Sequence, residues 1–374
     1  MTFRASLVAL ALLAAACAGS DSADTSADES SASTTTEALA DEVSTPDELD
    51  ETSSAEITTT STTTAPVEPA APSAAALPTG PIEVDCTNLQ RVGVGLQTGT
   101  FFSGDVEYDY QWTVPSTYVG EPIPVVLDFH GIGSNGAQQA VFSGWAAKAE
   151  TEGFLSVQPT GQSVPGDDRA SWELPQFDSP MRDDVAMVVD LLDFVSSSIC
   201  IDPNQVFATG MSNGGFFTSE VVCDLSGTIA AAVSVAGVTH HESCEPSRAV
   251  PYLAFHGTAD TTVPFAGGGV TTLDGLGTST EFFEQVMPDE FAEFAADFGC
   301  TESEDSAVTP EVTLTSWTGC TDDIEVGFYA IEGGGHTWPG SAISSLIATL
   351  GVTNLDIDAT DIAWQFFQRH PLAG

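Results

Sequence analysis

Short apolar runs alternate with runs of helical spacing from about residue 106 onward, and this alternation constrains the fold most strongly. Residues 124–130 (PVVLDFH), for example, are apolar almost throughout, as expected of a strand buried in a parallel sheet. Repeated strand–helix units predict an α/β domain with a mostly parallel central sheet and helices on both faces. The expected strands are 106–114, 124–130, 154–158, 205–209, 229–235, 250–255 and 325–331, and the expected helices are 137–152, 183–199, 213–223, 288–298 and 360–369.

The string GMSNG at residues 210–214 is a G-x-S-x-G pattern and is the strongest local signal. It lies between an expected strand, 205–209, and a helical run, which is the context that makes the pattern informative. A sharp strand-to-helix turn needs small residues on both sides of the serine and exposes the hydroxyl at the helix N-terminus. Ser212 is therefore the predicted nucleophile.

A serine hydroxyl needs an adjacent base, and the chain has only six histidines. His336 lies in GGGHTWPG directly after the expected strand 325–331, where a glycine-rich loop would let the imidazole reach Ser212. We therefore predict that His336 is the base. The other histidines after Ser212 are interpreted as loop, strand-end or surface residues: His240, His241, His256 and His370.

The acid should lie between nucleophile and base, in the chain order serine, acid, histidine. Asp260 follows the expected strand 250–255, in HGTADTTVPF. From the carboxyl end of that strand it can orient His336 and stabilise the imidazolium formed in the reaction. Asp260 is therefore the predicted third member of a catalytic triad.

Two backbone N–H groups are expected to form an oxyanion hole. One belongs to Asn213, the residue after the nucleophile. The other belongs to Gly131 or Ile132, in the loop after the expected strand 124–130. His130 itself is interpreted as a structural residue rather than a base.

Six cysteines remain when Cys17 is set aside, and an even number in an exported chain suggests three disulfides. Fifteen pairings are possible. Proximity favours Cys223–Cys244 and Cys300–Cys320, which leaves Cys86–Cys200. None of the cysteines has CxxC or Cys/His metal spacing, so we expect no zinc or other metal.

The first 80 residues have the composition of an export signal followed by a tether. Residues 1–17 resemble a signal peptide whose apolar run, LVALALL, is too short to span a bilayer. Cys17 follows three alanines, which approximates a lipoprotein processing site, so lipidation and ordinary cleavage both stay open. Residues 18–80 are rich in Ser, Thr, Pro and acids and predict a disordered tether. Residues 81–374 then form one catalytic domain.

The chain carries 54 acidic and 7 basic side chains, a formal net charge of −47. A surface this negative repels nucleic acid and anionic polymers, because phosphate binding needs Lys and Arg. Solubility in a saline setting is the simpler explanation of the charge itself. A neutral ester, polymeric or small, is compatible as the substrate both with repulsion of anionic partners and with solubility in a saline setting.

With GMSNGG, HGTADTTVPF and GGGHTWPG in this order, the chain resembles the secreted polyhydroxybutyrate depolymerase and feruloyl-esterase-like family over about residues 106–370. The resemblance implies the α/β-hydrolase fold. It also implies the roles of nucleophile for Ser212, orienting acid for Asp260 and base for His336.

The resemblance marks Trp172 and Trp338 as candidate walls of the substrate site, and core packing explains each equally well. The chain also departs from the family pattern. Family members often have a cysteine where Ile132 stands, and no polymer-binding module is visible.

We therefore expect a secreted or lipid-anchored extracellular serine esterase, monomeric, without a cofactor, that acts through an acyl-enzyme. Its membrane contact would be limited to the lipid anchor. The substrate could be a hydroxybutyrate polyester or oligomer, or a feruloyl or acetyl ester of polysaccharide. A serine peptidase of the same fold and a catalytically silent binding protein are the alternatives.

Overall fold

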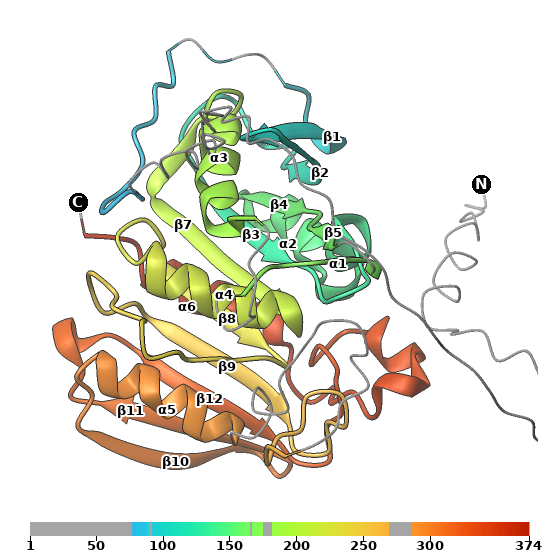
Figure 1. Cartoon of the computed structure of the whole chain (residues 1–374), viewed down its shortest axis with the longest axis vertical. Helices are drawn as coiled ribbons and strands as arrows, with labels where there is room; N and C mark the ends of the chain where they lie inside the picture. The colour runs from blue at the N-terminus through green and yellow to red at the C-terminus, as the bar shows by residue number, and fades with distance from the viewer. Residues whose placement is uncertain are drawn as a thin grey trace, which may run out of the picture. The chain divides into compact units, whose positions relative to one another are not determined.

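A ten-stranded β-sheet forms the centre of the folded part of the chain (Figure 1). The structure is a computed structural model that describes residues 77–87, 89, 92–164, 167–174, 182–268 and 286–373. Residues 76–374 form one compact unit. The expected signal peptide, the lipidation site Cys17 and all but the end of the expected tether lie outside the described residues.

Helices and strands follow one another along the chain largely as predicted. The strands of the sheet are β1 (Gly95–Ser103), β2 (Val106–Val114), β3 (Ile123–Phe129), β4 (Leu155–Pro159), β7 (Ile201–Met211), β8 (Ala231–Val235), β9 (Tyr252–Gly257), β10 (Glu302–Thr309), β11 (Val312–Thr318) and β12 (Val326–Ile331). The α-helices are α1 (Gly136–Ser143), α2 (Trp145–Glu152), α3 (Asp184–Ser196), α4 (Asn213–Asp224), α5 (Met287–Asp297) and α6 (Ala359–Arg369). A small separate hairpin consists of β5 (Gln162–Val164) and β6 (Asp167–Ser171).

The central strands are parallel, and antiparallel strands extend the sheet at both sides. The strand order is β1-β2-β4-β3-β7-β8-β9-β12-β11-β10, and every neighbouring pair from β4 to β12 is parallel. The prediction of a mostly parallel sheet is confirmed. Because parallel strands end at the same edge, the loops after β3, β7, β9 and β12 meet there. These loops carry the oxyanion segment, the serine, the acid and the histidine that the sequence predicts.

Both faces of the sheet are covered, because side chains of the central strands alternate between two apolar cores. In β9, Tyr252 and Ala254 belong to the core that includes residues of α3, α4 and α5. Leu253 and Phe255 point the other way, into the core that includes residues of α2 and α6. Figure 1 shows α4 and α5 lying along one face of the sheet.

The single helix expected over residues 137–152 is wrong. Two helices, α1 and α2, occupy this region, and they are separated by Gly144 at φ 79°. This left-handed conformation ends α1 and is the kind that glycine adopts without strain. The break turns the chain so that Trp145, at the start of α2, is fully buried.

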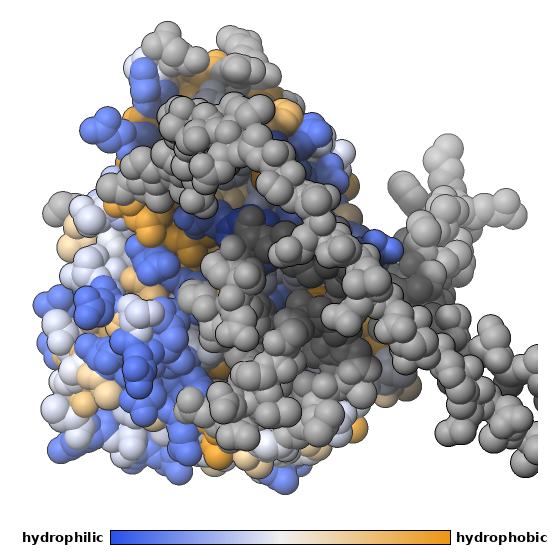
Figure 2. All heavy atoms as spheres, in the orientation of Figure 1, coloured by the Kyte–Doolittle hydropathy of each residue, from blue (hydrophilic) through white to orange (hydrophobic). Residues whose placement is uncertain are grey.

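The outer strands β1, β10 and β11 were not predicted from the sequence, and β10 also lacks a buried face. In β10 every residue but the last is exposed, so no apolar alternation marks the strand. Figure 2 shows hydrophilic side chains gathered over α5 and β10. The exposed acids of these two elements include Asp289, Glu293, Glu302, Glu304 and Asp305. Charges on such an edge oppose pairing with another chain.

Three disulfides join Cys86 to Cys200, Cys223 to Cys244 and Cys300 to Cys320. The last two are the pairs that proximity in the sequence favours, and the first is the pair that they leave. The first ties the segment before β1 to the start of β7, across 114 residues of chain. Within the described ranges, none of the helices has the length and apolar character needed to cross a bilayer.

Candidate active site

Ser212 lies on the sharp turn between β7 and α4. Its backbone has φ 57° and ψ −123°, a conformation that costs a residue with a side chain about 1–3 kcal/mol. Flanking glycines make the turn possible, since a Cβ on Gly210 would lie 2.2 Å from the Gly214 oxygen. A Cβ on Gly214 would lie 2.1 Å from the Phe129 oxygen. The G-x-S-x-G pattern is thus a steric requirement of this turn.

Asp260 and His336 form a hydrogen-bonded pair at the same edge of the sheet. Asp260 follows β9, His336 follows β12, and Asp260 Oδ2 lies 2.8 Å from His336 Nδ1. The other carboxylate oxygen accepts the amides of Thr262 and Val263 at 2.8 and 2.9 Å. Because an ionised carboxylate can only accept, Nδ1 carries the proton and Nε2 is left as an acceptor. That tautomer is the one that a general base needs.

The loops that carry this pair are in direct backbone contact. The Ala259 amide donates to the Gly334 oxygen at 2.9 Å, and the Thr258 amide donates to the Ile331 oxygen at 2.9 Å. Gly335 also packs closely against a later segment of the chain: a Cβ on Gly335 would lie 2.2 Å from the Leu350 oxygen. The glycines before His336 therefore permit close packing of the loop.

Ser212 lies at this edge too, but no hydrogen bond joins it to the histidine. Only β8 separates β7 from β9 in the sheet. The backbone at the end of β8 is hydrogen-bonded to the segments on either side of it. The Ser212 amide donates to the Val235 oxygen at 2.9 Å, and the Ala236 amide donates to the Phe255 oxygen at 2.8 Å. Among the described residues, the ring of His336 is hydrogen-bonded to Asp260 alone. In substrate-free enzymes the contact from nucleophile to base is often long and shortens in the reacting complex.

A second histidine, His256, also contacts the acid. Its ring is buried, with Nε2 2.9 Å from the Val263 oxygen and 3.4 Å from Asp260 Oδ2. A carbonyl oxygen only accepts, so Nε2 carries the proton; Nδ1 is buried without a hydrogen-bond partner among the described residues. Burial by itself would raise the pKa of Asp260, but the hydrogen bonds from His256 and His336 outweigh it and hold that pKa well below its usual range. The sequence offered one signal for this contact, the i, i+4 spacing of His256 and Asp260.

All three candidates for the two predicted oxyanion donors are unpartnered among the described residues. The amides of Gly131, Ile132 and Asn213 donate no hydrogen bond to that part of the chain. Gly131 lies directly beside the nucleophile, since a Cβ on it would be 3.2 Å from Ser212 Cβ and 3.8 Å from Oγ. The loop is fixed beyond this point, because the Gly133 amide donates to the Ala170 oxygen at 2.8 Å. Free amides beside a serine hydroxyl are suited to holding an oxyanion.

His130 is buried just before these amides and is a neutral structural residue. Its Nε2 accepts the Gly161 amide at 2.9 Å, so the proton is on Nδ1, which donates to the Gly131 oxygen at 2.7 Å. Burial lowers the pKa of His130 to about 4. The ring is therefore uncharged at neutral pH and braces the loop through dipoles alone.

The structure places both candidate site-wall tryptophans in apolar cores, each 1% exposed. Trp172 contacts His130 and Asn213, on the two sides of the predicted oxyanion hole. The indole N–H of Trp338 donates to Thr360 Oγ1 at 2.9 Å. Trp338 also lines an open hollow of about 450 Å³ between the α1–α2 pair and the start of α6, to which Ser212, Asp260 and His336 do not contribute.

The remaining histidines pair with carboxylates other than Asp260. The Nε2 atoms of His240, His241 and His370 lie within hydrogen-bonding distance of Asp297, Glu220 and Glu325, respectively. These pairings leave His336 as the one of the six whose ring bonds the predicted acid through Nδ1.

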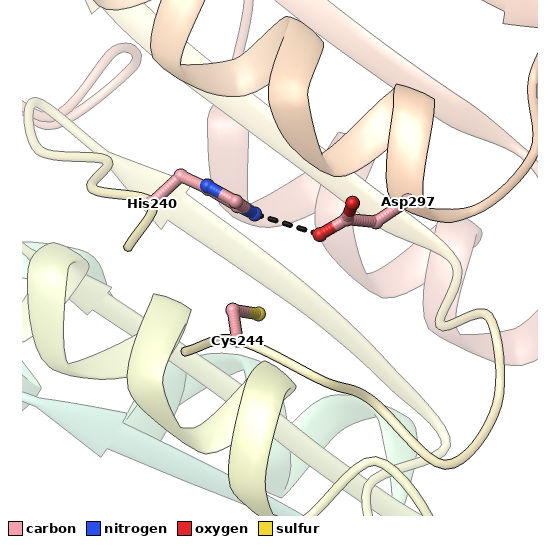
Figure 3. A group of neighbouring side chains, drawn as sticks. All are labelled: His240, Cys244 and Asp297. Carbon is pink, nitrogen blue, oxygen red and sulfur yellow. Dashed lines mark hydrogen bonds and ion pairs between the residues drawn. The ribbon is translucent and has the colours of Figure 1, made fainter. Parts of the chain in front are cut away.

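Figure 3 shows His240, Cys244 and Asp297, which are grouped with the spacing of metal ligands. Cys244 is bonded to Cys223, so its sulfur is not a thiolate that could bind a metal. His240 Nε2 is also engaged, 2.7 Å from Asp297 Oδ2. The group is better explained as part of the contact between the loop after β8 and α5.

No protein-family model matches the chain. It is 28% identical over 228 residues to feruloyl esterase B of Piromyces equi, a match that covers 59% of this chain but only 41% of that relative. It is also 28% identical over 115 residues to poly(3-hydroxyalkanoate) depolymerase C of Paucimonas lemoignei, which covers 30% of this chain and 28% of the relative.

Among solved structures, an acetyl xylan esterase from Aspergillus awamori aligns with a TM-score of 0.51. The alignment covers 73% of this chain and 99% of that one, at 17% sequence identity. At this level of identity the likeness concerns the fold alone. It confirms the α/β-hydrolase fold expected from the sequence.

Proposed function

The chain is a distant homologue in the feruloyl esterase and poly(3-hydroxyalkanoate) depolymerase-like family of α/β-hydrolases, and from this premise we propose that it is a serine carboxylic ester hydrolase with Ser212, Asp260 and His336 as its triad. The observation that carries the proposal is the 2.8 Å bond between Asp260 and His336, at the sheet edge that also holds the strained Ser212.

Each step of ester hydrolysis has a residue suited to it. His336 Nε2 takes the proton of Ser212 Oγ as this oxygen attacks the ester carbonyl carbon. The oxyanion forms between the amides of Asn213 and of Gly131 or Ile132, and Asp260 stabilises the imidazolium. His336 then protonates the leaving alcohol. Water attacks the acyl-enzyme with His336 again as base, and Ser212 and the free acid are released.

Replacement of the nucleophile is the direct test. Ser212→Ala should lower the kcat for p-nitrophenyl acetate on the order of 10⁶-fold without changing the melting temperature. Ser306→Ala, on the exposed strand β10, is the matched control and should keep full activity. A fluorophosphonate probe should label the wild type at Ser212 and leave the variant unlabelled. Full activity in Ser212→Ala would refute the triad.

For the substrate, we favour feruloyl or acetyl esters carried by a neutral polysaccharide, with a hydroxybutyrate polyester as the second candidate. The feruloyl esterase match extends over 228 residues and the depolymerase match over 115. The net charge of −47 opposes an anionic polymer. Rates on methyl ferulate, acetylated xylan and hydroxybutyrate oligomers would rank the candidates.

Two other functions predict different results in the same assays. A serine peptidase of this fold would cleave a peptide p-nitroanilide, an amide substrate that an enzyme confined to carboxylic esters leaves intact. A catalytically silent binding protein would not react with the fluorophosphonate. The unpartnered amides beside Ser212 favour a catalytic site over the silent protein, because a binding module has no use for an oxyanion hole.

We place the enzyme outside the cytoplasm, as a monomer whose substrate is its main partner. Three disulfides support an oxidising compartment. Residues 1–17 are proposed as the export signal, with lipidation at Cys17 as one route to the cell surface and residues 18–80 as the tether. Mass spectrometry of the mature N-terminus would show either a lipid on Cys17 or simple cleavage, and sedimentation would give the oligomeric state.

A further inference from the structure

Trp172 makes polar contacts to both sides of the predicted oxyanion hole. It follows β6, outside every loop that carries the triad, and it is 1% exposed. Its indole N–H donates to the His130 oxygen at 2.8 Å. Its backbone N–H donates to Asn213 Oδ1 at 2.7 Å, and its carbonyl accepts Asn213 Nδ2 at 3.1 Å. One residue therefore joins the loop after β3 to the start of α4.

The bond to His130 bears directly on the first oxyanion donor. The carbonyl of His130 and the N–H of Gly131 belong to the same peptide group, and in a trans peptide the two point in opposite directions. An indole proton on the carbonyl oxygen therefore fixes the plane of this group and aims the Gly131 N–H away from Trp172. The hydrogen bond also polarises the peptide, which strengthens its N–H as a donor.

The bonds to Asn213 bear on the second donor. Its side-chain amide is held at both ends by the backbone of Trp172, so the first residue of α4 cannot turn independently. The backbone N–H of Asn213 remains unpartnered among the described residues. With both sides fixed to one residue, the two donors keep a constant separation, which is the preorganisation that an oxyanion hole requires.

Aromatic packing holds Trp172 in this position. Its ring stacks on Phe217 of α4 with centroids 5.1 Å apart and planes 10° apart, and it meets Phe129 of β3 edge-on at 5.4 Å. These contacts lie on the same two elements that carry the oxyanion donors. Packing and hydrogen bonds thus fix β3, α4 and the segment after β6 as one unit.

We propose that Trp172 is the positioning residue of the oxyanion hole, which sets the separation and direction of the Gly131 and Asn213 amides without touching the substrate. This role rests on the proposed esterase function. It replaces the interpretation of Trp172 as a wall of the substrate site.

The variant that isolates the role is Trp172→Phe, which keeps an aromatic ring against Phe217 and removes the indole donor. Trp145→Phe is the matched control, since Trp145 is equally buried, stacks on Phe367, and has an indole N–H without a partner among the described residues. We expect Trp172→Phe to lower kcat roughly 10- to 100-fold with KM within about twofold of wild type, less than the loss of a whole donor. Trp145→Phe should keep the wild-type kcat.

A tetrahedral inhibitor separates positioning from general loss of structure. Phenylboronic acid forms an adduct on the serine with one oxygen in the oxyanion hole, so its affinity should fall in Trp172→Phe by about the same factor as kcat. A structural defect alone would lower the melting temperature of both tryptophan variants and leave the boronate affinity of the folded protein unchanged. Wild-type kcat and boronate affinity in Trp172→Phe, or equal losses in the two variants, would overturn the proposal.

Asn213→Ala gives a second route should Trp172→Phe fail to fold, because it keeps the backbone N–H and removes the side chain held by Trp172. It should lower kcat and boronate affinity together, and wild-type values would count against the proposal. The outcome is separable from the esterase proposal. A wild type that neither hydrolyses p-nitrophenyl acetate nor reacts with fluorophosphonate refutes the esterase, whereas a reactive wild type with unaffected variants refutes the positioning role alone.

Discussion

The dipeptide His-Gly occurs at the carboxyl ends of two parallel strands, as His130-Gly131 after β3 and as His256-Gly257 in β9. Both rings are buried, at 0% and 1% exposure. His130 has backbone groups as its hydrogen-bond partners, the Gly161 amide and the Gly131 oxygen. His256 contacts a backbone oxygen and also lies 3.4 Å from the carboxylate of Asp260.

The difference matches the two charges that the proposed ester hydrolysis would create at this site. Around β3 a neutral histidine braces amides that face a developing oxyanion. Around β9 a histidine supports a carboxylate that faces a developing imidazolium. In the proposed reaction the same dipeptide would thus serve the negative end of the transition state in one loop and the positive end in the other. Substitutions around β3 and around β9 test this division of roles between the two histidines.

Among the substitutions around the two dipeptides, Asp260→Asn should have the largest effect, because it removes the negative charge on which the β9 side depends. The new side-chain amide would donate to His336 Nδ1, so the ring proton would lie on Nε2. Nε2 could then not accept the proton of Ser212 Oγ. We expect kcat to fall by about 10⁴-fold with little change in fold. Asp297→Asn, which removes the carboxylate paired with His240, is the control and should retain activity. Equal activity of the two variants would show that Asp260 is not the orienting acid.

Replacing Gly257 and Gly131 with alanine should lower the rate to different extents, because an added Cβ has less room at Gly257 than at Gly131. A Cβ on Gly257 would lie 2.2 and 2.5 Å from the oxygens of Gly334 and Gly335, so the loop before His336 must move. A Cβ on Gly131 would lie 3.2 Å from Ser212 Cβ, which needs only a small shift. A displacement of about 1 Å costs on the order of 100-fold in rate, so Gly257→Ala should lose at least that, and Gly131→Ala about 10-fold. Steady-state kinetics with circular dichroism would check this, and the reverse ranking would contradict the close packing of Gly257 against the His336 loop.

The pH dependence of the unfolding free energy should show that His130 is neutral in the folded protein. Burial lowers the pKa of His130 to about 4, below its ordinary value near 6.5, so the unfolded chain takes up a proton first as pH falls. The stability tied to the neutral ring is complete above pH 6.5 and is lost as pH falls toward 4, which amounts to about 2 kcal/mol between pH 7 and 4.5. His130→Gln does not titrate, so the gap in unfolding free energy between wild type and variant should narrow by that amount. Urea denaturation at the two pH values measures it, and a constant gap would mean that the folded ring takes up a proton as readily as the unfolded one.

The sequence was sufficient to predict the parallel core of the fold, and the three residues of the proposed triad follow strands that end at the same edge of the sheet. Buried strands such as β3 and β9 are recognised by nearly continuous apolar runs. The glycines around Ser212 and before His336 mark close-packed turns. The outer strand β10 has no such signal, because its residues are exposed on both faces. The break at Gly144 is equally hidden, since a lone glycine does not by itself reveal a left-handed conformation between two helices.

The contacts that position the site were harder to predict from the sequence, because they join residues that lie far apart in the chain. Trp172 meets His130 and Asn213 only after three separate segments pack together. Its role depends on which atoms face which, and hydrophobic spacing does not contain that information. His256 was closer to prediction, four residues before Asp260, but nothing in the string HGTAD says that its Nε2 turns back toward the carboxylate.

The effect expected at His256 is as small as that of Gly131→Ala, and it tests the comparison of the two dipeptides most directly. His256→Leu removes the donor near Asp260, which leaves the carboxylate more basic. The more basic carboxylate favours the imidazolium over the neutral imidazole that a general base needs. The acid limb of the kcat/KM profile should therefore move to higher pH, with a loss of roughly 10-fold in kcat/KM at neutral pH, as for one hydrogen bond to a charged group. His256→Gln can place an amide donor near the position of Nε2 and should return the limb toward the wild-type position. If both variants instead share the wild-type profile, His256 supports only the Val263 turn, and the two His-Gly dipeptides are alike in bracing backbone rather than opposite in charge.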